Sequence, residues 1–115
     1  MSEIDFLIGQ TVVEVRDDDR IVFEAGNEPE PSLYADVGRV VCLDPDGKPL
    51  ALPELVGRAI SQASTTDGTL LVTFTDGATL RTPPDPNHEA WQVVGGTPHS
   101  LVVCLPGGEL AVWDR

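Results

Sequence analysis

The most concentrated set of chemically capable side chains lies in the segment Asp85-Pro86-Asn87-His88-Glu89-Ala90-Trp91. A histidine beside carboxylates could act as a general base, because a neighbouring carboxylate stabilises the imidazolium and sets the tautomer. A small-ligand site here would be lined by Asp85, His88, Glu89 and Trp91. The favoured interpretation is a proline-stiffened loop with Trp91 buried, because no second strong ligand or nucleophile stands at a defining spacing.

Two cysteines, Cys42 and Cys104, stand 62 positions apart inside apolar strings, at no spacing typical of a metal or redox motif. Cys104 with His88 or His99 would make a nucleophile and its base. A free cysteine in an apolar string is more typically a small core residue. We therefore expect no catalytic residue, no metal site and no cofactor. A Cys42–Cys104 disulfide would require the fold to bring the two together, and reduced thiols fit the cytoplasmic location we expect.

A run of three acidic residues, Asp17-Asp18-Asp19, is the second concentrated feature, and Glu24 and Glu28 follow shortly after it. A calcium loop needs spaced acidic ligands, a glycine and a distal glutamate, which this run lacks. The run is more typical of a solvated hairpin tip. It could also attract a basic protein partner, which would bind Asp17, Asp18, Asp19, Glu24 and Glu28.

The net charge narrows the classes of partner. Seven Lys and Arg against 19 Asp and Glu leave −12, so we expect no binding to nucleic acid or to anionic membranes. The longest apolar run, Leu101 to Leu105, is too short to span a bilayer. Residues 1–56 carry 13 acidic and 4 basic groups, whereas residues 57–115 carry 6 and 3. The acidity is therefore concentrated in one half, although solubility alone can also explain an acidic surface.

The pattern of apolar residues predicts an all-β domain. Short runs alternate with period two between turn signals such as Asp46-Gly47 and Asp76-Gly77, and no long helical period is present. At most one short helical turn is expected, near residues 53–57, where Pro53 suits the first helical position. Strands are expected at 11–16, 21–25, 33–36, 39–43, 50–52, 59–64, 70–75, 78–82, 89–94, 101–105 and 110–113.

Length and turn spacing favour one domain over residues 1–115, folded as an antiparallel β-sandwich or small barrel of about 8–10 short strands. Its core is aliphatic, because Phe, Tyr and Trp together number only six. Chains of this size can bury a real core without disulfides.

An internal repeat joins residues of about 9–52 to residues of about 57–113. Gly9-x-x-Val12-x-x-Val15 matches Gly57-x-x-Ile60-x-x-Ala63, and Ile21-x-Phe23 matches Val72-x-Phe74. The tetrapeptide Val40-Val41-Cys42-Leu43 recurs identically as residues 102–105, and Leu50-Ala51-Leu52 matches residues 110–112. The order of signals predicts a duplicated β-unit, although any all-β chain can repeat short apolar strings.

Two motifs carry a family resemblance: residues 84–91, with Pro-Asp-Pro before Glu-Ala-Trp, and residues 104–113, Cys-Leu-Pro-Gly-Gly-Glu-Leu-Ala-Val-Trp. Together with Gly9-Gln10 and the Asp76-Gly77 hairpin, they resemble a family of small proteins from high-GC bacteria known only as a domain of unknown function. In that family a tyrosine often precedes Glu-Ala-Trp, and this chain has His88 there. The departure argues against an essential base, and the resemblance implies no activity.

These observations favour a non-enzymatic protein-binding module. The most specific version of this hypothesis is an immunity or antitoxin-like protein whose acidic face masks a basic partner; the alternative is a small-ligand-binding protein with its site at 85–91. If Trp113 were exposed beside Trp91, the pair would form an interaction patch, although core or sheet-edge positions are more typical. The chain is expected to be a monomer or a homodimer built through an exposed strand edge.

Overall fold

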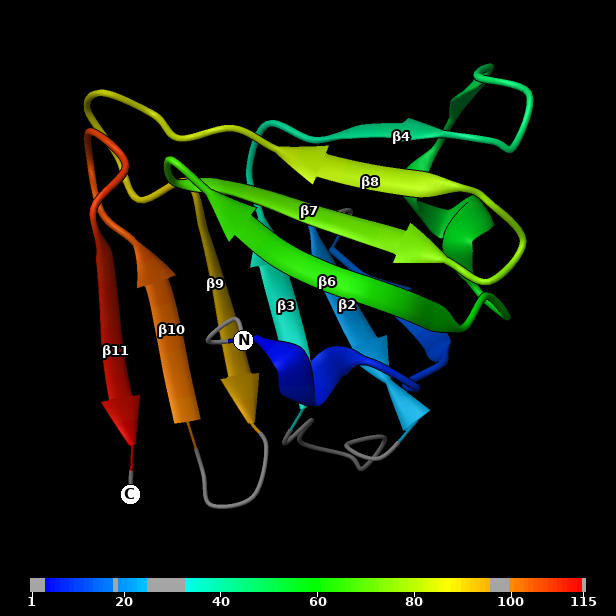
Figure 1. The fold of residues 1–115 in the computed structure, drawn as a ribbon, viewed down its shortest axis with the longest axis horizontal. Helices are drawn as coiled ribbons and strands as arrows, with labels where there is room; N and C mark the ends of the chain where they lie inside the picture. Colours follow the sequence, from blue (N-terminus) through cyan, green and yellow to red (C-terminus); the bar gives the residue numbers. More distant parts are fainter. Residues whose placement is uncertain (1–3, 18, 25–32, 96–99, 115) are drawn as a thin grey trace.

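The all-β prediction is confirmed. The computed structural model describes residues 4–17, 19–24, 33–95 and 100–114, and these contain two antiparallel sheets packed as a sandwich (Figure 1). The described residues form eleven strands, which equals the number of strand ranges expected from the sequence and slightly exceeds the prediction of about 8–10 for the domain. They are β1 (Val12–Arg16), β2 (Arg20–Phe23), β3 (Tyr34–Val37), β4 (Val41–Leu43), β5 (Pro49–Leu50), β6 (Ile60–Thr66), β7 (Thr69–Phe74), β8 (Thr79–Thr82), β9 (Trp91–Gly95), β10 (Ser100–Cys104) and β11 (Leu110–Asp114).

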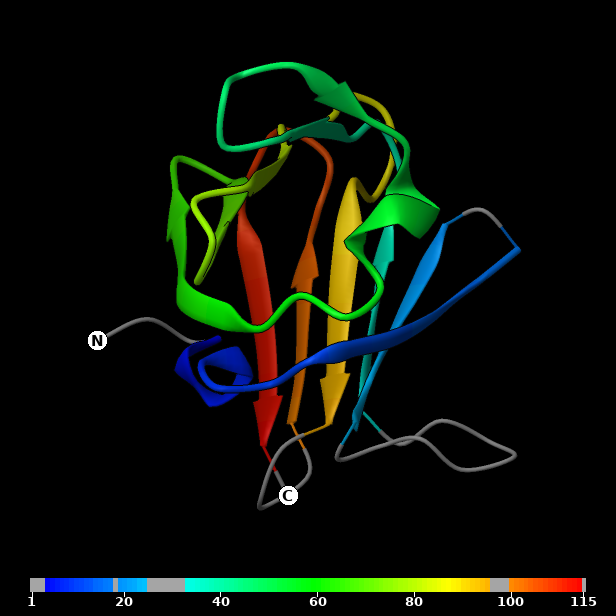
Figure 2. The same cartoon turned by 90° about the vertical axis from the view of Figure 1, so that its right-hand side faces the viewer.

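The chain crosses between the sheets twice. One sheet has the order β1-β2-β3-β9-β10-β11 and the other β5-β4-β8-β7-β6. Strands β1 to β3 build half of the first sheet, β4 to β8 build the second, and β9 to β11 return to the first. The strands of the two sheets run across one another (Figures 1 and 2). None of the helices in the described residues is long and apolar enough to cross a membrane.

The prediction of at most one helical turn was wrong, because the described residues contain two 3-10 turns, η1 (Asp5–Leu7) and η3 (Leu52–Leu55). The second lies near the predicted 53–57. It begins with Pro53 in its first turn, and the Glu54 carboxylate accepts the Ala51 N–H at 2.6 Å. The first has neither a proline nor a side-chain cap, so no local signal marks it. Burial of Leu7, which is 1% exposed, holds it against the core.

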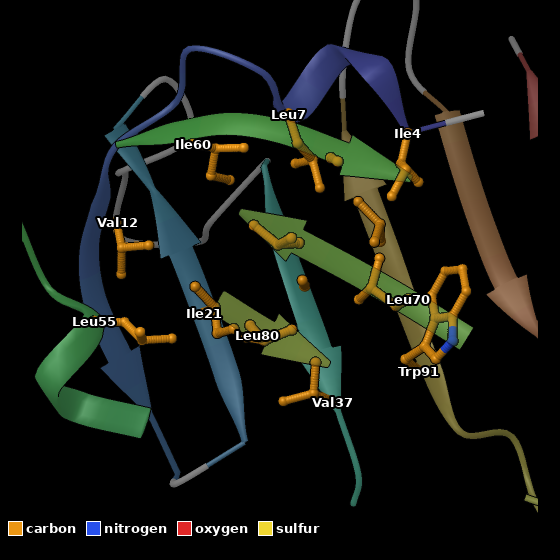
Figure 3. Close-up of a cluster of buried hydrophobic side chains, with 14 of the residues drawn as sticks. Ile4, Leu7, Val12, Ile21, Val37, Leu55, Ile60, Leu70, Leu80 and Trp91 are labelled. Carbon is orange, nitrogen blue, oxygen red and sulfur yellow. The ribbon is translucent and has the colours of Figure 1, made fainter. Parts of the chain in front are cut away.

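The core lies between the sheets and is mostly aliphatic, as predicted. Alternate residues of each strand point inward, so Ile21 of β2 lies beside Leu80 of β8, and Leu70 of β7 lies beside Trp91 of β9 (Figure 3). Leu7 and Leu55 each close one part of the cluster from a 3-10 turn, and Trp91 fills another end (Figure 3). This packing determines which side chains remain on the outer faces.

The first half of the predicted repeat has a direct counterpart in the strand registers. In the β1–β2 hairpin, Val12 pairs with Phe23 and Val15 with Ile21, with a register shift after Val12. In the β6–β7 hairpin, Ile60 pairs with Phe74 and Ala63 with Val72, with the same shift after Ile60. These are the residues that the sequence match aligned. The duplication itself stays a prediction.

The two hairpins also exchange equivalent backbone hydrogen bonds where the chain segments before β1 and β6 meet. Gly9 N–H donates to the Ile60 carbonyl at 2.8 Å, and Gly57 N–H donates to the Val12 carbonyl at 2.7 Å. Both glycines have a positive φ, 91° and 93°, which explains why glycine opens each repeat. Thr11 and Ala59 form a bridge at the centre of this exchange.

The second half of the repeat alignment was wrong. It matched β4 to β10 through the identical tetrapeptide, but β4 pairs with β8, and the strand that pairs with the corresponding β3 is β9. Strand β10 lies one position further out, beside β9. The tetrapeptide therefore lies on strands that are not equivalent, because any strand with one buried face favours the same apolar alternation.

A buried hydroxyl gives the first testable prediction. Thr82 of β8 is fully buried, and among the described residues its Oγ1 has no hydrogen-bond partner. In the other sheet, β2 pairs Ile21 with Ala35 in the way that β7 pairs Val72 with Leu80. Val37 of β3 and Thr82 of β8 each lie two residues further along, so Val37 is the position that corresponds to Thr82. Replacing Thr82 with valine, which has the same shape, should raise the free energy of unfolding by about 1 kcal/mol, because an unpaired buried hydroxyl is costly.

Urea denaturation followed by circular dichroism would measure this change. The reverse substitution, Val37→Thr, is the matched control and should lower the free energy of unfolding by about the same amount. Loss of stability in Thr82→Val would contradict the prediction.

Candidate functional site: an acidic cleft

An open cleft of about 260 Å³ lies at one end of the six-stranded sheet. It is formed where the turn between β1 and β2, the end of β3 and the start of β9 come together, at the upper end of these strands in Figure 1. We call it the acidic cleft, because three of its lining side chains are carboxylates. Its lining residues are Asp19, Asp36, Val37, Gly38, Glu89, Ala90, Trp91 and Gln92.

Backbone hydrogen bonds hold the cleft together. Val37 N–H donates to the Asp19 carbonyl at 2.9 Å, which ties the β1–β2 turn to the end of β3. Gly38 N–H donates to the Ala90 carbonyl at 3.0 Å, which ties β3 to the segment entering β9. A Cβ on Gly38 would lie 3.1 Å from the same carbonyl oxygen, so a larger residue would press on this contact.

Asp36 is the most strongly bonded carboxylate of the cleft. Its two oxygens accept hydrogen bonds from Arg20 Nε at 2.7 Å and Arg20 Nη2 at 3.0 Å. Gln92 Nε2 donates to it at 2.7 Å, and the Arg20 guanidinium stacks over the Tyr34 ring at 4.1 Å. The hydrogen bond to Asp36 raises the pKa of Arg20, against the opposing effect of burial. Asp36 is therefore matched by a positive charge.

The other two carboxylates differ from Asp36. Asp19 and Glu89 are exposed, and within the described part of the chain neither forms a salt bridge. The cleft therefore presents more negative than positive charge to solvent. It could receive a basic side chain, because Asp19 and Glu89 are exposed and line the same cleft.

The acidic residues predicted to bind a partner are divided by the fold. Asp17 and Asp19 are exposed in the turn before β2, whereas Glu24 is exposed after the last residue of β2, at the opposite end of the strand. Of this set only Asp19 lines the cleft. Asp18 and Glu28 lie outside the described residues.

The residues predicted to bind a small ligand are also divided. Asp85 accepts hydrogen bonds from the N–H groups of Asn87 at 2.7 Å and His88 at 3.1 Å, and the bond from Asn87 is the main cause of its lowered pKa. Asp85 therefore shapes its own loop. His88 is exposed, and only Glu89 and Trp91 reach the cleft.

Trp91 belongs to the core. It is 3% exposed, and its indole Nε1–H donates to the Gly68 carbonyl at 3.0 Å. Cys104 Sγ donates to the same oxygen at 3.3 Å, so the turn between β6 and β7 is joined to β9 and β10 of the other sheet. Trp113 is 53% exposed and points to the opposite face of its sheet, so the two tryptophans form no common patch.

Neither thiol is placed as an activated nucleophile. Burial raises the pKa of Cys42 to about 11 and also raises the pKa of Cys104, which keeps both protonated near neutral pH. The two cysteines are free, on different sheets. His99 lies outside the described residues. In the part of the chain that the structure covers, no three His, Cys, Asp or Glu side chains are grouped to hold a metal ion.

The residues that sequence reasoning missed are Asp36 and Gln92. Each is an isolated polar residue on an otherwise apolar strand, and their contact requires β3 to pair with β9. A polar residue in the middle of a strand is a weak signal for a site, and the pairing partner is not readable from either segment alone.

Comparison with known proteins supports the predicted resemblance at the level of the family. No curated protein and no solved structure matches the chain. The model of one family, described as a family of unknown function (DUF6188), matches residues 4–114 and so covers both sheets and the acidic cleft. The chain belongs to this family of unknown function.

Proposed function

We propose that this chain is a non-enzymatic protein-binding module, and that its acidic cleft receives a basic segment of a protein partner. The observation that carries the proposal is the position of Asp19 and Glu89, two exposed carboxylates without a salt bridge among the described residues, on a single cleft. Asp36, already bonded to Arg20, lines the same cleft.

The charge distribution supports the same proposal. The chain has a net charge of −12, most of it in residues 1–56, and the β1–β2 turn with Asp17 and Asp19 comes from this half. A surface of one sign speeds the approach of an oppositely charged partner, and this effect weakens as salt is added. The most specific form of this proposal is an immunity or antitoxin-like role, in which this chain masks the basic active site of its partner.

The test is a charge reversal on each side of the cleft. An oligo-arginine peptide serves as the probe, and its affinity is measured by isothermal titration calorimetry at low salt. Asp19→Lys and Glu89→Lys should each weaken binding about 2- to 5-fold, because a partly exposed charge pair contributes only a modest energy. The double variant should lose about 10-fold, and added salt should weaken binding of the unaltered chain.

Glu24→Lys is the matched control, because it makes the same charge change at an exposed position at the other end of β2. It should weaken binding less than either cleft variant. An equal loss in all three would mean that the peptide responds to net charge alone, and the cleft would then have no special role. The masking role is tested separately: if a neighbouring gene encodes a basic nuclease-like toxin, co-expression of this chain should protect cells from that toxin.

A further inference from the structure

Strand β11 forms one edge of the six-stranded sheet, and within the described ranges no strand pairs with its outer side (Figure 1). Its five residues pair with β10 in continuous register, from Leu110 opposite Cys104 to Asp114 opposite Ser100. An uninterrupted edge presents a row of backbone donors and acceptors that another strand can join.

The other three sheet edges carry features that discourage such pairing. Strand β1 has a register shift after Val12 and an ion pair between Glu14 and Arg16. Strand β6 has the equivalent shift after Ile60. Strand β5 has only two residues, and one of them is Pro49. Bulges, charges, prolines and short length are the usual protection of edge strands. Strand β11 has none of these within its register, and a single charged residue, Asp114, at its end.

The side chains of β11 add apolar surface on both faces of the sheet. Val112 is 45% exposed on the inner side and Trp113 is 53% exposed on the outer side. On the outer face Trp113 continues a cross-strand row with Leu101 and Val94. Half-exposed tryptophan beside an open backbone edge is typical of a surface that pairs with another chain.

We propose that β11 pairs with β11 of a second copy of this chain, antiparallel about a two-fold axis at Val112. Residues that lie opposite each other must point to the same face of the joined sheet, so the two residue numbers of each pair sum to an even value. Among the registers that meet this condition, only the one centred on Val112 pairs all five residues of β11. Val112 then lies opposite Val112 of the partner, and Trp113 lies opposite the small Ala111. This register is self-complementary, since it sets large against small and brings no two like charges together.

The charge distribution and the size of the contact determine the strength of this dimer. The ten residues of β10 and β11 contain one charged side chain, whereas the acidic cleft lies at β3 and β9 in the middle of the sheet and the β1–β2 turn at its other edge. One strand edge covers less than the roughly 800 Å² per partner of a standard interface. We therefore expect a weak dimer, with a dissociation constant on the order of 100 μM. Added salt should strengthen it, because it screens the repulsion between two chains of charge −12.

Sedimentation velocity over a range of protein concentrations tests the proposal directly. The unaltered chain should shift from monomer to dimer as concentration rises, and at high salt the shift should occur at lower concentration. Val112→Asp should abolish it, because two carboxylates would face each other at the axis. Val56→Asp is the matched control, since Val56 is 48% exposed at the end of η3, which packs against β1 at the other edge of the sheet. It should leave the dimer intact.

Cysteine cross-linking tests the register and does not depend on a destabilising substitution. Facing residues of antiparallel strands have Cα atoms about 4.5–5.5 Å apart, within the range that a disulfide spans. Val112→Cys should therefore form a covalent dimer on mild oxidation. Trp113→Cys should not, because its copies would lie two positions apart along the strands, at about 8 Å. Cys42 and Cys104 are buried, so the unaltered chain should give no covalent dimer.

A chain that stays monomeric at millimolar concentration and high salt overturns the proposal, and would leave the β11 edge for a strand of another protein. A dimer that persists in Val112→Asp, or cross-links as well at position 113 as at 112, overturns it too. The inference is independent of the acidic cleft, because salt strengthens this association and weakens binding of a basic partner.

Discussion

Replacing Gly68 with alanine should lower the free energy of unfolding by about 3 kcal/mol or more. Gly68 lies in the turn between β6 and β7 with φ of +83°, and a Cβ built there would lie 2.6 Å from Gly108 Cα and 2.7 Å from Gly108 O. Both contacts are with backbone, which cannot rotate away. The β6–β7 turn must therefore move away from the β10–β11 turn. The Gly68 carbonyl moves with it, away from its donors Trp91 and Cys104.

Gly47→Ala is the matched control for this substitution. Gly47 has the same φ of +83°, and no atom lies within 4 Å of the Cβ position. Gly47→Ala should lower the free energy of unfolding by only about 1–2 kcal/mol, which is the cost of a left-handed backbone conformation for an L-residue. The difference between the two variants in urea denaturation measures the contact between the two turns. Equal costs would show that this contact contributes nothing to stability.

The second large effect is expected at Trp91. Replacing it with alanine should lower the free energy of unfolding by about 3–5 kcal/mol, because the side chain is 3% exposed and fills one end of the core. Trp91→Phe should cost about 1–2 kcal/mol, since it keeps an aromatic ring in the core but removes the N–H that Gly68 accepts. Circular dichroism is the suitable probe, because it does not depend on the lost indole.

This pair of variants also separates the two roles considered for Trp91. If Trp91 were a ligand platform, alanine would cost little stability. A loss below about 1 kcal/mol in Trp91→Ala would contradict the core role.

The strands were predictable because their signals are local. In β7, Leu70, Val72 and Phe74 alternate with polar or exposed residues between two Asp-Gly turns, and each inward residue is buried. The glycines and apolar pairs of the first two hairpins also recur at matching positions, with positive φ at Gly9 and Gly57 and equivalent strand registers. The 3-10 turn η1 was not predictable, because only tertiary burial of Leu7 marks it.

The candidate site was predictable only in fragments. Asp19 belongs to a conspicuous acidic run and Glu89 to a conspicuous polar segment, but the sequence assigns them to two different hypotheses. The structure places both on one cleft and leaves Glu24, His88 and Asp85 off it. Asp36 completes the cleft through Arg20 and through Gln92, which is 56 positions away in the chain.

The sequence by itself determined the all-β class, the turns and the excess of negative charge, because alternation, turn chemistry and composition are properties of short segments. Only the tertiary structure decided which strands are neighbours, and so which polar residues meet. Pairing of β3 with β9 and the free edge of β11 follow from closing long loops around one shared core, and that choice depends on all the strands together. The net charge of −12 follows from composition alone, whereas the meeting of Asp19 and Glu89 in one cleft is a consequence of the fold.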